Sequence, residues 1–286
     1  MHARHERPAT VPAPYRLATL PSGIHVPYVD SGTGEPVLFV HGSLCDQRYW
    51  DSQTSVLAAQ FRCIALSLSH YWPLAGEAAE GEFGWRAHVD QLAAFIRTLG
   101  GGPVHLVGHS RGAGVAFQLP RHHPQLVRTL TLADPGGPLA DDASPTPAAV
   151  TDGLHEKVIP LIGAGAIEAA LELFVDAVSM PGIWRRSPPG FRAMAMDNAS
   201  TLPKQLRDPL PAYTRAAAEQ VRCPALLIAG AASPPIYRHN VEALSHWLAS
   251  AQTRIMLGAS HGMNFTHAAQ FNRLLAGFLS SQASDT

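Results

Sequence analysis

The chain has 286 residues, of which 46% are hydrophobic and 15% are charged, and its formal net charge is −1. A nearly neutral chain of this length has no excess of positive charge with which to bind nucleic acid or an anionic membrane, and it is long enough for one large α/β domain with an insertion. Its apolar runs are shorter than the roughly 18 residues that a membrane-spanning helix needs, so we expect no membrane span.

The cysteines and the N-terminal segment indicate the compartment. The sequence has three cysteines, Cys45, Cys63 and Cys223, an odd number without the spacing of a metal site. Residues 1–14 carry proline, histidine and charged residues but no apolar stretch like that of a secretion signal. We therefore expect free thiols, a cytoplasmic protein without metal or cofactor, and disorder over residues 1–14.

Short apolar runs alternate with helical patterns along most of the chain. A first pair of strands is predicted around the turn Pro21-Ser22-Gly23. The predicted strands cover residues 15–20, 24–29, 37–40, 63–68, 104–107, 129–133, 225–229 and 254–257, and the predicted helices cover 88–99, 110–122, 241–249 and 268–279. Buried parallel strands have this length and apolar character. The alternation predicts an α/β fold, with a mostly parallel twisted sheet covered by helices on both faces.

The alternation stops after residue 135. A linker rich in proline, glycine and aspartate leads into helical patterns over residues 148–161, 166–180 and 189–198, and no strand pattern returns before residue 222. We interpret residues 136–221 as a helical cap inserted over the carboxyl ends of the strands. The core domain then consists of residues 15–135 and 222–282.

The pentapeptide Gly108-His109-Ser110-Arg111-Gly112 directly follows a predicted buried strand and precedes a predicted helix. This is the layout of a nucleophile elbow, in which a serine sits at the tip of a strained turn. Glycines two positions before and after the serine remove Cβ atoms that would clash in such a turn. The helix begins at the serine, so its free N–H groups point toward developing negative charge.

Three further motifs join the elbow. His41-Gly42-Ser43 follows the strand at 37–40, Asp30-Ser-Gly-Thr-Gly34 forms a turn before that strand, and Leu257-Gly-Ala-Ser-His261-Gly ends the last strand. Together with the order of strands and the helical insertion, these motifs resemble the α/β-hydrolase fold superfamily over residues 15–280. The resemblance is specific for the fold and less so for the chemistry, because this scaffold hosts many reactions.

The resemblance implies a catalytic pair. Ser110 is the candidate nucleophile, and a serine hydroxyl needs an adjacent base at neutral pH. His261 is the candidate base, because the fold brings the loop after the last strand over the elbow. His41 is expected to support the oxyanion loop, and His109 to pack beside the nucleophile or line the pocket.

The acid of the triad presents a problem. In most relatives it lies in the loop after the next-to-last strand, where this chain has Ser233, which carries no charge, and the next carboxylate, Glu242, falls within the following helix. Some lipases and zearalenone-type lactonases instead place the acid after the strand that follows the elbow helix, and there this chain has Asp134. We take Asp134 as the acid. Two alternatives remain open: Asp134 only caps a turn, or the triad has no carboxylate.

The remaining site assignments also follow from the resemblance. The oxyanion hole is expected to use the backbone N–H groups of Arg111 and Ser43, with Leu44 as an alternative to Ser43. The predicted pocket residues are Leu44, His109, Trp184 and Met263. Apolar side chains in the insertion favour small hydrophobic esters and lactones over charged substrates.

The leading hypothesis is a serine hydrolase that cleaves a carboxylic ester or lactone through a Ser-His-Asp triad and an acyl-enzyme. One alternative is a carbon–carbon bond hydrolase of the meta-cleavage type, although those relatives usually keep the acid in the late loop. A second alternative is a non-catalytic binding protein with the hydrolase fold. We expect a monomer or a homodimer.

Overall fold

The structure is a computed structural model that describes residues 15–76, 79–100, 102–140 and 153–282. The predicted disorder over residues 1–14, and the start of the helix predicted at 148–161, lie outside the described residues. The other predicted elements can be compared directly with the structure.

Within the described residues, eight strands form one twisted sheet in the order β1-β2-β4-β3-β5-β6-β7-β8. Their bounds are β1 Arg16–Thr19, β2 His25–Ser31, β3 Pro36–Val40, β4 Arg62–Leu66, β5 Val104–His109, β6 Val127–Ala133, β7 Ala225–Gly230 and β8 Ala251–Met256. β2 runs antiparallel to β1 and β4, and the remaining pairs are parallel. This sheet confirms the predicted α/β fold class.

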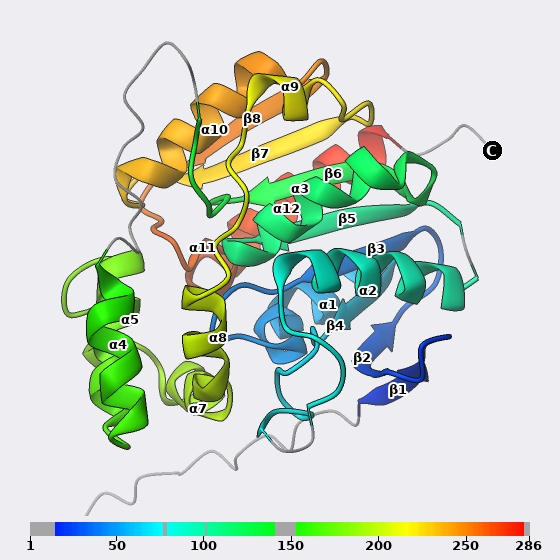
Figure 1. Ribbon diagram of the computed structural model, residues 1–286. Coiled ribbons are helices and arrows are strands. Elements are labelled where there is room, and N and C mark those ends of the chain that lie inside the picture. The colour runs from blue at the N-terminus through cyan, green and yellow to red at the C-terminus, as the bar shows by residue number, and fades with distance from the viewer. Residues whose placement is uncertain (1–14, 77–78, 101, 141–152, 283–286) are drawn as a thin grey trace, which may run out of the picture.

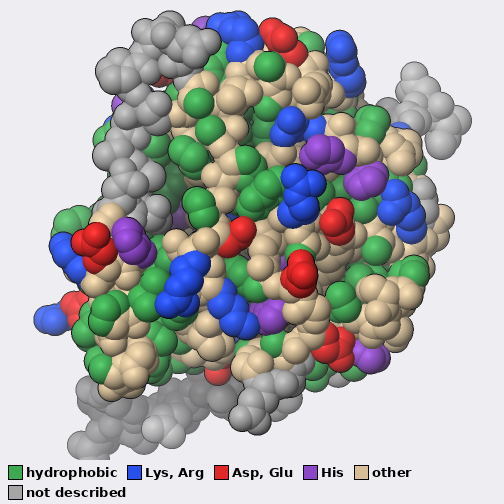
Figure 2. Space-filling view, viewed as in Figure 1, with side chains coloured by type: hydrophobic (Ala, Val, Ile, Leu, Met, Phe, Trp, Pro, Cys, Tyr) green, Lys and Arg blue, Asp and Glu red, His purple; other side chains and the backbone are tan. Residues whose placement is uncertain are grey.

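Helices cover both faces of the sheet (Figure 1). One face carries α2 Trp85–Thr98, α3 Arg111–His122, α9 Arg215–Ala218 and α10 Pro235–Trp247; the other carries α1 Asp51–Leu57, α11 Met263–Thr266 and α12 Ala268–Ser281. The central strands β5, β6 and β7 are almost fully buried, as a sheet covered on both faces requires. Figure 2 shows basic and acidic side chains interspersed over the face that carries α2, α3 and α10.

Several elements begin earlier than their sequence patterns indicate, and for α10 and β8 the physical reason is clear. α10 begins at Pro235, six residues before the predicted helix, because proline at the first helical position needs no N–H partner and already has a helical φ. β8 begins three residues before the predicted strand. It is the edge of the sheet and its side chains are mostly exposed, so it lacks the apolar run that marks the buried strands.

The segment between β6 and β7 is helical and has an apolar core of its own. Before α9, its described helices are α4 Leu154–Gly163, α5 Ile167–Val178, α6 Ile183–Arg186, α7 Pro189–Asp197 and α8 Leu202–Leu206. Figure 1 places them beyond the end of the sheet at which β5, β6 and β7 finish. Leu44, from the loop after β3, packs into their apolar cluster.

The two connections into and out of this helical segment run side by side. Leu139 and Tyr213 form a parallel bridge, and the Ala140 N–H donates to the Tyr213 carbonyl over 2.9 Å. The Tyr213 hydroxyl donates to the carbonyl of Gly136 over 2.9 Å. The chain therefore leaves the core for these helices and returns to the core at the same place.

Buried polar groups join the helical segment to the core. Asp46 is fully buried, and its carboxylate accepts from the Arg48 guanidinium and from the Asn198 amide, at 2.6 and 2.8 Å from Oδ2. Arg48 also reaches Asp197 at the end of α7, over 2.8 Å. A buried carboxylate is tolerated only when it is paired in this way, so this contact fixes α7 against the core.

Two buried histidines predict how stability responds to acid. His88 on α2 is fully buried, and burial together with the charge of Arg111 lowers its pKa to about 3. Burial lowers the pKa of His41 to about 4. The unfolded chain takes up these protons near pH 6.5 whereas the folded chain does not. Stability is therefore retained above pH 6.5 and falls as the pH drops below it.

The free energy of unfolding should therefore decrease as the pH falls below 6.5. We expect His88→Gln to make this decrease smaller by about 1.4 kcal/mol for each pH unit below 6.5. The measurement is urea unfolding of the parent and the variant at pH 7.5 and 5.5, compared as differences between the two pH values. The exposed His122→Gln is the matched control and should behave like the parent. An unchanged pH dependence in His88→Gln would contradict the expectation.

Candidate active site

Ser110 lies at the tip of a strained turn between β5 and α3. Its φ of +54° and ψ of −124° lie outside the usual regions for a residue with a Cβ atom. A Cβ on Gly112 would lie 2.2 Å from the His41 carbonyl oxygen, and one on Gly108 would lie 2.6 Å from the Gly112 carbonyl oxygen. Packing therefore requires both glycines of the pentapeptide.

His261 lies over this turn, in the loop after β8. Its Nε2 is 3.0 Å from Ser110 Oγ, and its Nδ1 is 3.0 Å from Asp134 Oδ2. Asp134 is fully buried, whereas the side chain of Ser110 reaches the cavity above the turn. The structure thus brings the three residues together in one hydrogen-bonded chain.

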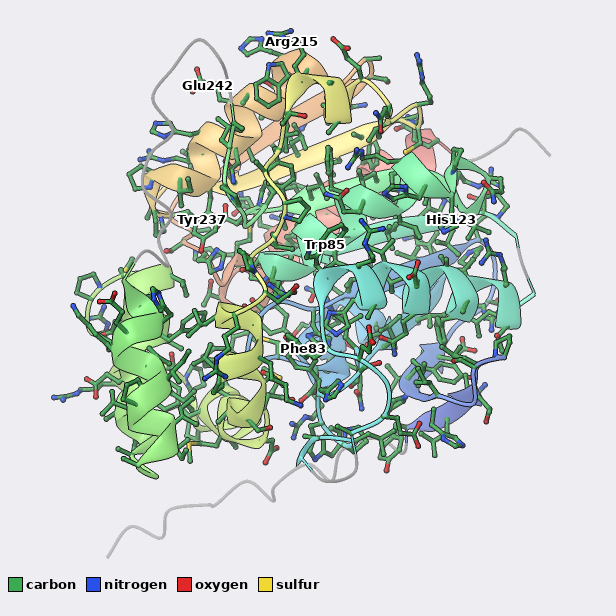
Figure 3. All side chains as sticks on the ribbon, in the orientation of Figure 1. Phe83, Trp85, His123, Arg215, Tyr237 and Glu242 are labelled. Atoms are coloured by element: carbon green, nitrogen blue, oxygen red, sulfur yellow. The ribbon has the colours of Figure 1, made fainter. Side chains whose placement is uncertain are left out.

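The Asp134 carboxylate is held by donors from the neighbouring strand. Its Oδ1 accepts from the N–H of Gly230 over 3.2 Å, and its Oδ2 accepts from the Ser233 hydroxyl over 2.6 Å. Ser233 occupies the position where most relatives place the acid, and it donates a hydrogen bond to Asp134, a contact that the sequence analysis missed. Glu242 lies on α10, exposed at the outside of the molecule (Figure 3).

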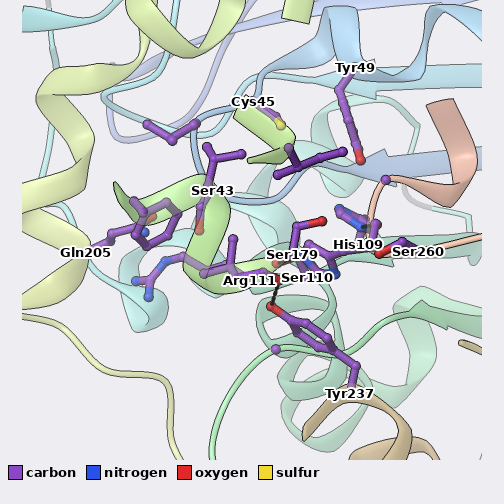
Figure 4. A pocket seen from close by; sticks show the side chains of 18 of the residues that line it. Ser43, Cys45, Tyr49, His109, Ser110, Arg111, Ser179, Gln205, Tyr237 and Ser260 are labelled. Carbon is purple, nitrogen blue, oxygen red and sulfur yellow. Dashed lines mark hydrogen bonds between the residues drawn. The ribbon is translucent and has the colours of Figure 1, made fainter. Parts of the chain in front are cut away.

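Tyr237 is a second residue that the sequence analysis missed. Its ring stacks on His261, with centroids 4.1 Å apart and planes 16° apart, and its hydroxyl donates to the Val178 carbonyl at the end of α5. Figure 4 shows the hydroxyl directed toward Ser110. Burial raises the pKa of Tyr237, and the nearby Asp134 raises it further, so the phenol keeps its proton at neutral pH. Tyr237 lies beside His261 because α10 already begins at Pro235. The helix predicted from the sequence covered residues 241–249 and therefore did not include Tyr237.

The backbone around Ser110 contains the expected oxyanion donors. Arg111 is the first residue of α3, so its N–H has no intrahelical acceptor. Ser43 lies on the loop after β3, which approaches so closely that a Cβ on Gly42 would lie 2.9 Å from Ser110 Cβ. Leu44 next to it has a φ of +59°.

His41 holds this loop in place. Its Nδ1 donates to the Gly42 carbonyl over 2.9 Å, and its Nε2 accepts from the Leu68 N–H over 3.1 Å. Both ring nitrogens are engaged, and burial keeps the ring neutral by lowering its pKa to about 4. The ring therefore has the supporting position that the sequence predicted.

A cavity of about 550 Å³ opens above Ser110. Leu44 and His109 line it, as predicted. Trp184 and Met263 do not: Trp184 is buried in the apolar cluster of the helices between β6 and β7, and Met263 is buried in the cluster beneath α12. The side chains of the helical segment that line it include Phe174, Val178, Ser179, Ile183, Phe191 and Gln205.

The lining is apolar over most of its area, and among the described residues it includes no carboxylate. The Arg111 guanidinium is paired with Asp208, its Nη2 lying 2.6 Å from Asp208 Oδ2. Within the same described part of the chain, no cluster of three His, Cys, Asp or Glu could hold a metal ion, and no helix is long and apolar enough to cross a membrane.

Comparisons with known proteins identify related sequences and folds. The model of the family described as the alpha/beta hydrolase family matches residues 37–274. The chain is 26% identical over 268 residues to the 2-hydroxymuconate semialdehyde hydrolase of Pseudomonas sp. (strain CF600), which covers 90% of this chain and 91% of that protein. Its fold is similar to that of an esterase from Exiguobacterium antarcticum, with a TM-score of 0.78, 17% identity and coverage of 92% and 98%.

Another relative matches over a shorter region. The dihydrolipoyllysine-residue acetyltransferase component of the acetoin cleaving system of Cupriavidus necator is 34% identical over 167 residues, which are 58% of this chain and 42% of that protein. The chain therefore matches less than half the length of this relative.

The geometry predicts that Ser110 reacts with electrophiles. A fluorophosphonate should label Ser110 in the folded protein, and His261→Ala should slow the labelling by about 100-fold or more, because the hydroxyl then has no base. Mass spectrometry of the labelled peptide identifies the site. Ser179→Ala, which removes another hydroxyl from the same cavity, is the matched control and should be labelled at the parental rate. Labelling that is insensitive to His261→Ala would contradict the base assignment.

Proposed function

Because the chain belongs to the alpha/beta hydrolase family, we propose that it is a serine hydrolase that cleaves a carboxylic ester or lactone. The observation that carries the proposal is the hydrogen-bonded chain Ser110–His261–Asp134 beneath an apolar cavity. In this proposal, residues 136–221 form a cap that covers the cavity. The substrate is a small hydrophobic molecule, as the lining favours.

The proposed reaction begins at Ser110. Its Oγ attacks the carbonyl carbon while its proton moves to Nε2 of His261. The resulting oxyanion accepts hydrogen bonds from the N–H groups of Arg111 and Ser43, which point at the developing charge. The imidazolium is stabilised by the carboxylate of Asp134 across the 3.0 Å contact.

The acyl-enzyme then forms and breaks down. His261 returns its proton to the leaving oxygen, so the carbon–oxygen bond of the ester breaks and the alcohol departs. In a lactone this oxygen stays attached to the acyl group. A water molecule then gives a proton to His261 and attacks the acyl carbon. The bond between the acyl carbon and Ser110 Oγ breaks, and His261 returns the proton to Oγ, so the acid is released and Ser110 is restored.

A second candidate function is hydrolysis of a carbon–carbon bond next to a carbonyl group. It is favoured by the long match to the 2-hydroxymuconate semialdehyde hydrolase, which extends over 90% of this chain. The same Ser110 and His261 could serve both reactions. The position of the acid counts against this candidate, because relatives of that type usually place it where this chain has Ser233.

The two candidates are separated by substrate. Purified protein should hydrolyse p-nitrophenyl esters or aliphatic lactones and leave a vinylogous 1,5-diketone intact, and Ser110→Ala should abolish the activity. Faster cleavage of the diketone would favour the carbon–carbon hydrolase. Failure of the protein to cleave any of these substrates, together with no labelling of Ser110, would favour a binding protein.

The acid assignment predicts a graded result at two positions. Asp134→Asn should lower kcat by about 10⁴-fold, because the amide cannot stabilise the imidazolium. Ser233→Ala removes one hydrogen bond to the carboxylate and should lower kcat by about ten- to a hundredfold. Both are measured on one ester, with circular dichroism to confirm folding. Near-parental turnover in Asp134→Asn would refute the proposed triad.

A further inference from the structure

Gln205 on α8 is a buried amide that faces the cavity without a protein partner for its oxygen. The side chain is 6% exposed and lines the cavity above Ser110. Among the described residues, no donor reaches its Oε1. Buried polar atoms are nearly always hydrogen-bonded, so an unpaired amide oxygen in a binding cavity indicates that its partner comes with the ligand. The oxygen itself is buried, and because the terminal torsion of glutamine is soft, rotation about it brings the oxygen to the cavity.

The position of Gln205 relative to the nucleophile is fixed. Arg111, the residue after Ser110, donates to the Asp208 carboxylate over 2.6 Å and to the Asp208 carbonyl over 3.0 Å. The Asp208 N–H in turn donates to the Gln205 carbonyl over 3.2 Å. The N–H of Trp85 at the start of α2 adds a further bond to Asp208, over 2.8 Å.

This anchoring lies where core and cap meet. Figure 3 marks Phe83 and Trp85 near the start of α2, on the side of the core that meets the cap. The Arg111 guanidinium lies 5.7 Å above the ring of Phe83. The turn that carries Gln205 is therefore held against the elbow rather than free to swing away.

The paired charge of Arg111 favours an uncharged substrate group beside Gln205. The charge of Arg111 is already balanced by Asp208, and no carboxylate lines the cavity within the described residues. A substrate carboxylate on Gln205 would meet the Arg111 guanidinium already neutralised by Asp208, and burying an unpaired charge is costly. The other guanidinium of the lining, Arg186, lies on α6 and donates to the Pro181 carbonyl over 3.2 Å. A hydroxyl fits, because it donates to the amide oxygen and also accepts from the amide nitrogen.

The proposed reaction decides which part of the substrate reaches Gln205. His261 must protonate the leaving oxygen, so the leaving group lies on the side of Ser110 that His261 and the stacked Tyr237 occupy. Figure 4 shows Gln205 and Ser43 on the other side of Ser110 from Tyr237. The acyl part therefore extends toward Gln205.

We propose that Gln205 is a specificity-determining residue that binds an uncharged hydroxyl group on the acyl part of the substrate. The preferred substrates are thus esters or lactones of hydroxy acids rather than of simple fatty acids. This inference rests on the proposed serine hydrolase function.

The test compares matched pairs of p-nitrophenyl esters. One pair is 3-hydroxybutanoate, as each enantiomer, against 3-methylbutanoate, and the other is 6-hydroxyhexanoate against heptanoate. In each pair a methyl group replaces the hydroxyl. The measured quantity is the ratio of kcat/KM within a pair, and a loss of folded protein cancels because both esters are measured on the same sample.

In the parent protein the hydroxy ester should be favoured in at least one pair, and Gln205→Met should lower that ratio by about tenfold, the effect of one hydrogen bond. Ser187→Ala is the matched control. Ser187 also lines the cavity, but its hydroxyl already donates to the Ile183 carbonyl, so the ratio should not change.

The outcomes separate the two proposals. Hydrolysis by the parent with ratios that Gln205→Met leaves unchanged in both pairs overturns the role of Gln205 and leaves the hydrolase intact. An equal drop in Ser187→Ala also overturns it, because the effect would then belong to the cavity as a whole. Failure of the parent to hydrolyse any of the esters overturns the proposed ester chemistry and the inference with it.

Discussion

The contact between His261 Nδ1 and Asp134 Oδ2 joins residues that are 127 positions apart in the chain, and the proposed chemistry depends on it. The contact exists because β6 and the strands beside it are parallel, so their carboxyl ends meet at one edge of the sheet. Asp134 follows β6, and His261 arrives from the loop after β8. The intervening strand β7 contributes the N–H of Gly230, so it supports the carboxylate from the side.

The proposed acid lies at a different place on the scaffold from the acid of most relatives. Moving the carboxylate from the loop after β7 to the end of β6 leaves an empty acid position, and Ser233 fills it. The side chain of Ser233 is short enough to leave room for the Asp134 carboxylate, and its hydroxyl donates a hydrogen bond to that carboxylate. A buried carboxylate needs such donors, because burial without hydrogen bonds disfavours its charged form. The two positions therefore act as one unit, in which one supplies the charge and the other orients it.

The helices of the proposed cap are coupled to the turn at Ser110 by polar contacts. Arg111 follows the nucleophile and pairs with Asp208 at the end of the cap, while Asp46 and Asn198 make a second buried link. Tyr237 adds a third, because its ring packs on His261 and its hydroxyl reaches the carbonyl of Val178. A movement of the cap would break hydrogen bonds to charged or buried groups, so the shape of the cavity is set together with the position of the nucleophile.

The sequence by itself determined what is local. The strained turn at Ser110 needs glycine at 108 and 112, and the buried strands need apolar runs. The elbow, the succession of strands and helices along the chain and the α/β fold class could therefore be predicted from short stretches of residues. The site also depends on contacts between distant segments, which leave no such pattern. Only the tertiary structure decided that Ser233 donates to Asp134, that Tyr237 stacks on His261 and that Gln205 faces the cavity, whereas Trp184 and Met263 pack elsewhere. Whether an apolar side chain lines a cavity or fills a core depends on the neighbours that folding brings to it, and residue type does not specify those neighbours.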